Sequence, residues 1–156
     1  MSTNVERAIL AGGCYFIMQQ LLRERDGVIS TRAGWTGGEN ENPTFENNGG
    51  HAEAVEVAFD SDRLSYQELL QYFLMVHRAD LGGDVVGSYY RSEIFALSEE
   101  QHAIAEATIR DFDASGHWPG PITTRVSAAS RFWEEAPGEQ NYLRRFTAGR
   151  LAAMAS

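Results

Sequence analysis

Residues 8–22 read AILAGGCYFIMQQLL, a short apolar strand that breaks at two glycines and runs into an amphipathic helix. Apolar residues recur along this helix with the spacing of one buried face, at Cys14, Ile17, Met18, Leu21 and Leu22. Cys14 is the only cysteine of the sequence and stands at the predicted start of the helix. The free N–H groups and positive dipole end of a helix N-terminus favour the thiolate form of such a cysteine. Cys14 is therefore a candidate nucleophile, and the alternative is a buried structural cysteine.

Length and composition predict one domain over residues 1–156, because the chain is long enough and apolar enough for a hydrophobic core of its own. The formal net charge of −9 argues against nucleic acid and anionic membranes as partners, since both reward clustered Lys and Arg. The sequence shows no apolar run long enough to span a bilayer and no secretory signal, so we expect a cytoplasmic protein. A single cysteine excludes an internal disulfide and a cysteine-based zinc cluster. The four histidines show no metal-ligand spacing with carboxylates, so no metal site is expected.

The clearest strand is predicted over residues 51–60, where Val55, Val57 and Phe59 alternate with more polar positions. Glu53 falls on the same face as these apolar residues and is expected to point towards the core. Desolvation there raises the pKa of a carboxyl group, and a partly protonated carboxyl at neutral pH is what a general acid requires. The alternative is that Glu53 lies at the frayed start of the strand and is solvated.

Two further helices are predicted from capping boxes, Ser65 with Glu68 and Ser98 with Gln101. The other expected strands cover residues 8–11, 28–31, 90–97 and 122–126, and residues 39–50 are expected to form a surface loop. The order is strand, helix, strand, strand, helix, strand, helix, strand. This order predicts an α+β fold, a ferredoxin-like split β-α-β two-layer core with an appended helix and strand.

Several motifs occur in an order that resembles a known family. They are Gly12-Gly13-Cys14-Tyr15-Phe16, Gly34-Trp35-Thr36-Gly37-Gly38, Asn42-Pro43-Thr44-Phe45, Gly50-His51-Ala52-Glu53-Ala54-Val55, Ser65-Tyr66-Gln67-Glu68-Leu69-Leu70 and Gly87-Ser88-Tyr89-Tyr90-Arg91-Ser92. This ordered set, over roughly residues 8 to 130, resembles the A-type peptide methionine sulfoxide reductases. The resemblance implies the fold of that family.

The resemblance also implies a mechanism. In that family a thiolate attacks the sulfur of an S-configured methionine sulfoxide, a buried glutamic acid protonates the oxygen, and the cysteine becomes a sulfenic acid. Cys14 and Glu53 match these two residues, so the resemblance agrees with the roles inferred from their positions. Tyr90 matches a tyrosine that binds and polarises the oxygen, and its alternative is an aromatic residue that packs on the core.

The departures from the family pattern concentrate around the expected substrate pocket. Phe16 stands where the family usually has tryptophan, and Phe45 where it has a tyrosine whose hydroxyl reaches the oxygen. Val85 stands where an aspartate is usual, with Asp84 one position away. The motif that begins at Phe132-Trp133 does not continue in the usual way through residues 135–140. The expected substrate-binding residues are Tyr15, Phe16, Phe45, His51 and Val85.

No bound cofactor is expected, but the sequence holds no second cysteine to regenerate Cys14. A sulfenic acid at Cys14 therefore requires an external thiol, either a redoxin or a small cellular thiol. Three hypotheses remain at this point. The first is a one-cysteine reductase of free or peptide methionine sulfoxide, the second an enzyme of the same fold acting on another small molecule, and the third a binding module without catalysis.

Overall fold

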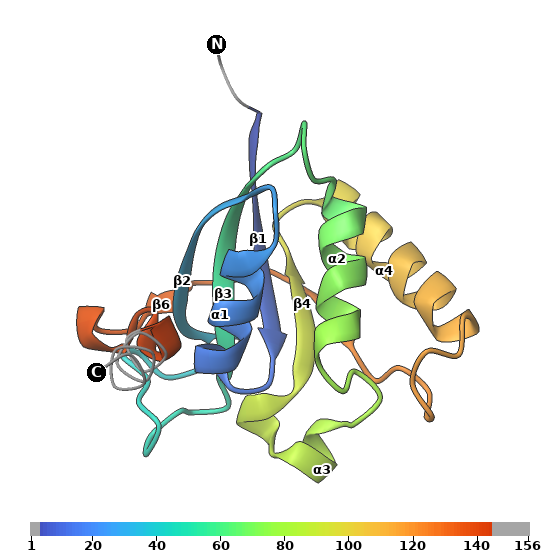
Figure 1. Ribbon diagram of the computed structural model, residues 1–156. Helices are drawn as coiled ribbons and strands as arrows, with labels where there is room; N and C mark the ends of the chain where they lie inside the picture. The colour runs from blue at the N-terminus through green and yellow to red at the C-terminus, as the bar shows by residue number, and fades with distance from the viewer. Residues whose placement is uncertain (1–3, 145–156) are drawn as a thin grey trace, which may run out of the picture.

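The computed structural model describes residues 4–144, which form a six-stranded sheet in the order β5-β4-β1-β3-β2-β6 (Figure 1). The central strand β1 is antiparallel to both β3 and β4, β2 is antiparallel to β3 and β6, and β5 is parallel to β4. The strands are β1 (Val5–Gly12), β2 (Val28–Thr36), β3 (Ala52–Asp60), β4 (Ser92–Ala96), β5 (Arg125–Ala128) and β6 (Trp133–Glu134). The α-helices are α1 (Tyr15–Glu24), α2 (Tyr66–Val76), α3 (Gly83–Val86) and α4 (Glu99–Ala114), and the 3-10 turns are η1 (Ser88–Tyr90) and η2 (Pro137–Glu139).

The main core lies between one face of the sheet and helices α1, α2 and α4. Alternation along β1 and β3 directs Leu10, Val55 and Val57 to this face, where they are fully buried with side chains from the three helices. A smaller cluster on the opposite face contains Ile9 and Phe95 and is covered by the segment that follows β5. In Figure 1 this orange segment crosses behind the sheet from β5 to β6.

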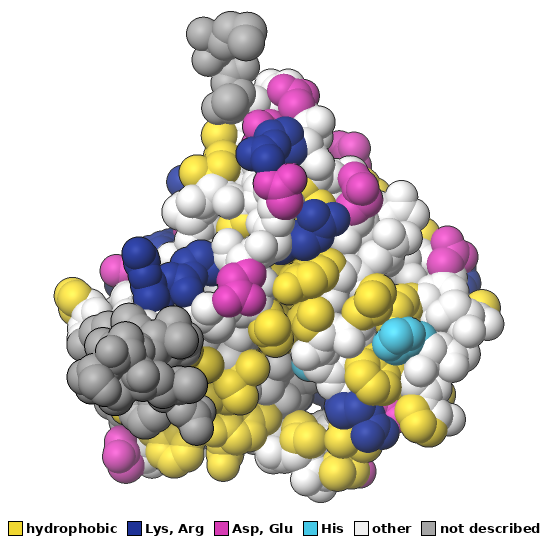
Figure 2. All heavy atoms as spheres, in the orientation of Figure 1, with side chains coloured by type: hydrophobic (Ala, Val, Ile, Leu, Met, Phe, Trp, Pro, Cys, Tyr) yellow, Lys and Arg dark blue, Asp and Glu magenta, His cyan; other side chains and the backbone are white. Residues whose placement is uncertain are grey.

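One end of the sheet collects the elements that carry the motifs. Strand β1 ends there at Gly12, which pairs with Ser92 at the start of β4, and helix α1 begins three residues further on, at Tyr15. Figure 1 shows α3 at this same end, below the start of α1. Figure 2 shows hydrophobic side chains gathered around this end of the molecule, whereas acidic and basic side chains gather towards the opposite end.

The predicted order of strands and helices is confirmed, and so is the capping box of Ser65 and Glu68 at the start of α2. At the start of α4 the expected capping box is wrong in one half. The Ser98 hydroxyl accepts a hydrogen bond from the backbone N–H of Gln101, as expected. The Gln101 side chain, however, accepts from the backbone N–H of Leu97 and not from that of Ser98. Strand β4 starts later than predicted, because Tyr90 belongs to η1, and β5 starts at Arg125. Strand β6 and helix α3 were not predicted, since two and four residues are too short for a periodic signal.

Among residues 4–144, no helix is both long enough and apolar enough to cross a membrane.

Candidate active site

Cys14 occupies the N-cap of α1, at the point where the chain leaves the central strand. Gly13 has a φ of +87°, a left-handed conformation that favours glycine. A Cβ on Gly12 would lie only 2.7 Å from Met18 Cε and 2.7 Å from Phe73 Cε1, so α1 and α2 pack directly against this glycine. The two glycines therefore place Cys14, which is half-buried, at the end of the sheet with its carbonyl accepting from the Met18 amide at 3.0 Å.

Glu53 lies next to this cysteine on β3, and its side chain is buried at 3 % exposure. Its Oε1 atom accepts a hydrogen bond from the Tyr15 backbone amide at 3.0 Å. Burial raises the pKa of Glu53 to about 7, against the opposing effect of the Tyr15 amide, and the Glu135 charge raises it further. The prediction that Glu53 faces the apolar side is confirmed, and the carboxyl group carries a proton for much of the time near neutral pH.

Two tyrosine hydroxyls lie within electrostatic range of Cys14 and Glu53. Burial raises the pKa of Tyr90, and the nearby charges of Glu53 and Cys14 raise it further. Burial also raises the pKa of Tyr15 strongly, with further contributions from Glu135 and Glu53. Both phenols are therefore protonated at neutral pH and are available as hydrogen-bond donors.

Aromatic rings flank the site on two sides. The Phe16 ring stacks on Tyr142 with centroids 4.6 Å apart and contacts Tyr15 at 4.9 Å. On the other side Phe45 contacts Tyr89 edge-on at 5.3 Å, and Tyr89 contacts Tyr90 at 4.5 Å. Phe45 is 55 % exposed, so it forms an outer rim of the site and offers no hydroxyl group.

The structure does not bring Val85 and His51, two of the expected substrate-binding residues, to the cavity beside Cys14. Val85 is 66 % exposed, whereas the next residue, Val86, lines the cavity beside Cys14, because α3 turns the chain at this point. His51 is buried, and both of its ring nitrogens contact loop backbone. Nδ1 accepts from the Gly38 amide at 2.9 Å, so the Nε2 proton is donated to the Asn40 carbonyl at 2.8 Å. His51 therefore fixes the loop after β2 and has no ring nitrogen left for a substrate.

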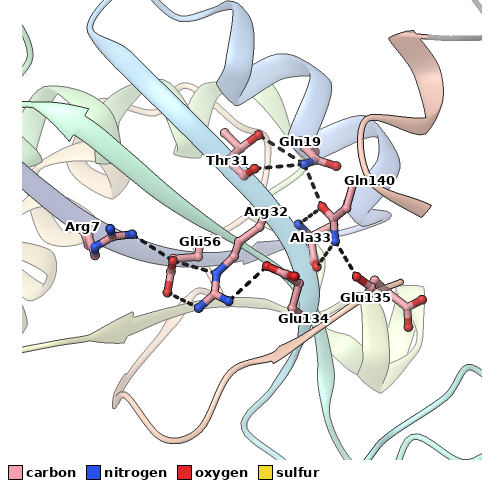
Figure 3. A network of polar contacts seen from close by, with 9 residues as sticks. All are labelled: Arg7, Gln19, Thr31, Arg32, Ala33, Glu56, Glu134, Glu135 and Gln140. Carbon is pink, nitrogen blue, oxygen red and sulfur yellow. Dashed lines mark hydrogen bonds and ion pairs between the residues drawn. The ribbon is translucent and has the colours of Figure 1, made fainter. Parts of the chain in front are cut away.

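The structure adds a C-terminal clasp, defined here as residues 133–142, which the sequence did not reveal (Figure 3). The side-chain amide of Gln140 accepts from the Ala33 backbone N–H at 2.7 Å and donates to the Ala33 carbonyl at 2.9 Å. These are the two hydrogen bonds that a neighbouring strand would make. Gln19 of α1 donates to the same Gln140 oxygen at 3.1 Å. Glu135 accepts from the Trp35 indole N–H at 3.1 Å. The clasp thus joins α1 and β2 and brings the Glu135 carboxylate near Glu53.

His77 is a second residue that sequence reasoning left without a role. It is largely buried beside Cys14, and burial lowers its pKa to about 4, so the ring is neutral at physiological pH. Among residues 4–144, no group of three His, Cys, Asp or Glu side chains is arranged to hold a metal ion.

A thiol at a helix N-terminus, beside a buried carboxyl group that retains its proton, is an arrangement that suits an enzyme with a cysteine nucleophile and a general acid. The sequence model of the family "Peptide methionine sulfoxide reductase" matches residues 6–155, and the chain belongs to that family. A curated relative from Nocardia farcinica, "Peptide methionine sulfoxide reductase MsrA", is 51 % identical over 150 residues, which cover 94 % of this chain and 88 % of the relative.

Solved structures agree with this assignment. Methionine sulfoxide reductase A of Corynebacterium diphtheriae has a TM-score of 0.75 and 26 % identity, over 92 % of this chain and 76 % of that chain. Reduced Mxr1 from Saccharomyces cerevisiae has a TM-score of 0.81 at 20 % identity, over 90 % of this chain and 85 % of that chain, and supports the fold. The yeast protein is also solved in complex with Trx2, with a TM-score of 0.65 at 18 % identity over 91 % of this chain and 89 % of that chain. The α+β fold of the family is confirmed, and the chain is a thiol-dependent methionine sulfoxide reductase, as the first of the three hypotheses states.

Proposed function

We propose that Cys14 is the nucleophile and Glu53 the proton donor of sulfoxide reduction, within a single catalytic unit formed by residues 1–156. The Cys14 thiolate attacks the sulfur of the sulfoxide, Glu53 protonates its oxygen, and the oxygen is transferred to Cys14 as the sulfide departs. Cys14 is oxidised by two electrons to a sulfenic acid, and the sulfoxide is reduced to methionine. A sulfoxide oxygen leaves only when it gains a proton, so the state of Glu53 controls this step.

The observation that carries the proposal is the position of Glu53. It is buried, it bonds to the amide of the residue that follows Cys14, and its pKa is about 7. A carboxyl group with this pKa keeps a proton for much of the time near neutral pH, as a general acid requires.

We assign Tyr90 as a second donor to the oxygen, supported by its proximity to Glu53 and Cys14. Phe45 has no hydroxyl group to donate, and Val85 is exposed and apolar. Tyr15 and Phe16 supply an apolar wall for the methyl group of the substrate. The resemblance to the A-type family predicts that the S form of free or peptide methionine sulfoxide is reduced.

An external thiol must return Cys14 to its reduced state, because the sequence has no other cysteine. Either a redoxin, which the complex of yeast Mxr1 with Trx2 supports, or a small cellular thiol can take this role. A cytoplasmic location stays a prediction, favoured by the supply of reduced thiols in that compartment and tested by cell fractionation.

The test is a single turnover of the separate S and R forms of N-acetylmethionine sulfoxide methyl amide, without added reductant. We expect release of one sulfide per protein from the S form, with Cys14 trapped as a sulfenic acid and identified by mass spectrometry. Cys14→Ser abolishes release, and Glu53→Gln slows it severely, whereas the matched exposed change Glu100→Gln does not. A Glu53→Gln variant as fast as the parent protein would refute the acid role, and no release from the folded protein would refute the proposed chemistry.

A further inference from the structure

Cys14 has two flanks, because β1 lies between β3 and β4 in the sheet. Glu53 lies on the β3 side and accepts from the Tyr15 amide there. Ser92 lies on the β4 side and pairs with Gly12. The proton donor Glu53 and the Ser92 side of the site thus approach the cysteine from different directions.

A cavity of about 190 Å³ opens onto Cys14 from the β4 side, and Glu53 does not line it. The side chains of Leu81 and Val86 give it apolar walls, and glycines form its floor. Its other lining residues are Gly12, Gly13, His77, Arg78, Tyr90 and Ser92. The space fits the –CH₂–SH arm of a small thiol beside Cys14.

Two polar side chains in the wall of this cavity, His77 and Ser92, are paired with each other. His77 Nδ1 donates to the Phe73 carbonyl at 2.7 Å, so its Nε2 accepts from the Ser92 hydroxyl at 2.8 Å. The Ser92 oxygen in turn accepts from the Thr124 hydroxyl at 2.7 Å. This chain of hydrogen bonds holds the two side chains in one arrangement, and the charge of Arg78 is compensated by Asp80.

The small cavity adjoins a larger hollow of about 690 Å³, and Ser92 lines both. Two charged residues in the hollow compensate each other, since Arg91 Nε donates to the buried Glu93 carboxylate at 2.7 Å. The side chains of two more, Arg125 and Asp84, have no hydrogen-bond or ion-pair partner among residues 4–144. They leave one positive and one negative charge for a ligand.

The reaction geometry connects the two spaces. Displacement at a sulfenic acid sulfur requires the attacking thiolate to lie in line with the S–O bond, opposite the oxygen. The oxygen lies towards Glu53, which protonated it, so the open approach is from the β4 side. A thiol that enters the small cavity from there extends its other end towards the hollow.

We propose that this cavity and hollow form the binding site of the reductant, a small peptide thiol whose zwitterionic end pairs its carboxylate with Arg125 and its ammonium group with Asp84. The inference rests on the proposed function of Cys14. The thiolate sulfur forms a bond to Cys14 Sγ, the S–O bond breaks, and the oxygen takes a proton from Glu53 and leaves as water. A second molecule of the same thiol attacks the outer sulfur of this mixed disulfide, which releases the Cys14 thiolate and a small-molecule disulfide.

The experiment follows the decay of the Cys14 sulfenic acid in the full chain, with glutathione as the probe and at equal thiolate concentrations. Its comparison thiols are N-acetylglutathione, which lacks the ammonium group, glutathione diethyl ester, which lacks the carboxylates, and 2-mercaptoethanol. We expect glutathione to react about fivefold faster than either derivative, the size of one exposed ion pair. Arg125→Ala removes the preference over the ester, and Asp84→Asn removes the preference over the acetyl derivative. The matched exposed change Arg110→Ala keeps both preferences.

Access is tested separately by Val86→Trp, which fills the cavity. We expect this variant to reduce the Cys14 sulfenic acid about tenfold more slowly with every thiol, because the block does not depend on charge, whereas the rate of sulfide release stays the same. The inference would be overturned if Arg125→Ala and Asp84→Asn kept both preferences. It would also be overturned if only thioredoxin reduced the Cys14 sulfenic acid of the parent protein. The sulfenic acid is also generated with hydrogen peroxide, so that a failure of sulfoxide turnover, which refutes the proposed function, is distinguished from a failure of thiol selection.

Discussion

Replacing Glu53 by Gln should change how the stability of the protein depends on pH, because the Glu53 pKa is raised, in contrast to carboxylates that ion pairs hold ionised. The folded pKa of Glu53 is about 7, whereas its ordinary value is 4.5. Below pH 4.5 the carboxyl group is protonated in both the folded and the unfolded chain and has no effect on their balance. Between pH 4.5 and 7 the unfolded chain loses this proton first, so the folded state is progressively disfavoured.

The size of the effect follows from the pKa change. At about 1.4 kcal/mol per pH unit, the ionisation of Glu53 removes about 3 kcal/mol of stability between pH 4.5 and values above 7. Gln cannot ionise and keeps an oxygen that accepts from the Tyr15 amide. Its buried NH₂ group adds a cost, but that cost is the same at every pH.

The assay is urea denaturation of the parent protein and of Glu53→Gln at intervals from pH 4 to 8.5. The difference in unfolding free energy between the two should move by about 3 kcal/mol in favour of the variant as the pH rises, with its midpoint near 6. Glu100→Gln, exposed on α4, serves as the matched control and should give a flat difference. A flat difference for Glu53→Gln would refute the conclusion that burial keeps this carboxyl group protonated.

Three further outcomes follow from the same contacts. The kcat/KM for sulfoxide reduction should fall about tenfold per pH unit above the Glu53 pKa of about 7, as the acid loses its proton, and a pH profile measures this limb. Phe45→Tyr should raise kcat/KM by about tenfold, because the new hydroxyl group adds a hydrogen-bond donor. Val85→Asp should leave kcat/KM unchanged, because Val85 is exposed. Equal effects of the two changes would contradict the assigned positions. Gln140→Ala should lower the free energy of unfolding by about 2–3 kcal/mol, since the Ala33 N–H and C=O lose their partners, and urea denaturation checks this value.

The parts of the site that the sequence predicted are those set by local periodicity. Alternation along residues 51–60 was enough to place Glu53 on the buried face, because the period of a strand fixes which side chains share a side. The glycine pair before Cys14 and the helical spacing after it predicted a helix-terminus thiol. The family motifs then related these positions to a reaction, which periodicity alone does not do.

The expected site residues that the structure does not bring to the cavity beside Cys14 are those whose neighbours come from elsewhere in the chain. Val85 and Val86 were one position apart in an apparent loop, and only the short helix α3 decides which of them turns towards Cys14. His51 was expected at a strand entrance beside the substrate, but its ring is held by Gly38 and Asn40 of the preceding loop. No pattern in the sequence specifies these contacts.

The clasp shows how a segment remote in sequence enters the chemistry of the site. Gln140 reproduces strand pairing through a side chain and fixes residues 133–142 against β2, which brings Glu135 to the indole of Trp35. Trp35 pairs with Glu53 across β2 and β3, so the charge of Glu135 acts on Glu53 and raises its pKa. Two carboxyl groups near one another disfavour the ionisation of the more buried one. The proton on Glu53 is therefore held in part by the C-terminal clasp, so the order of the clasp and the acid strength of Glu53 are coupled.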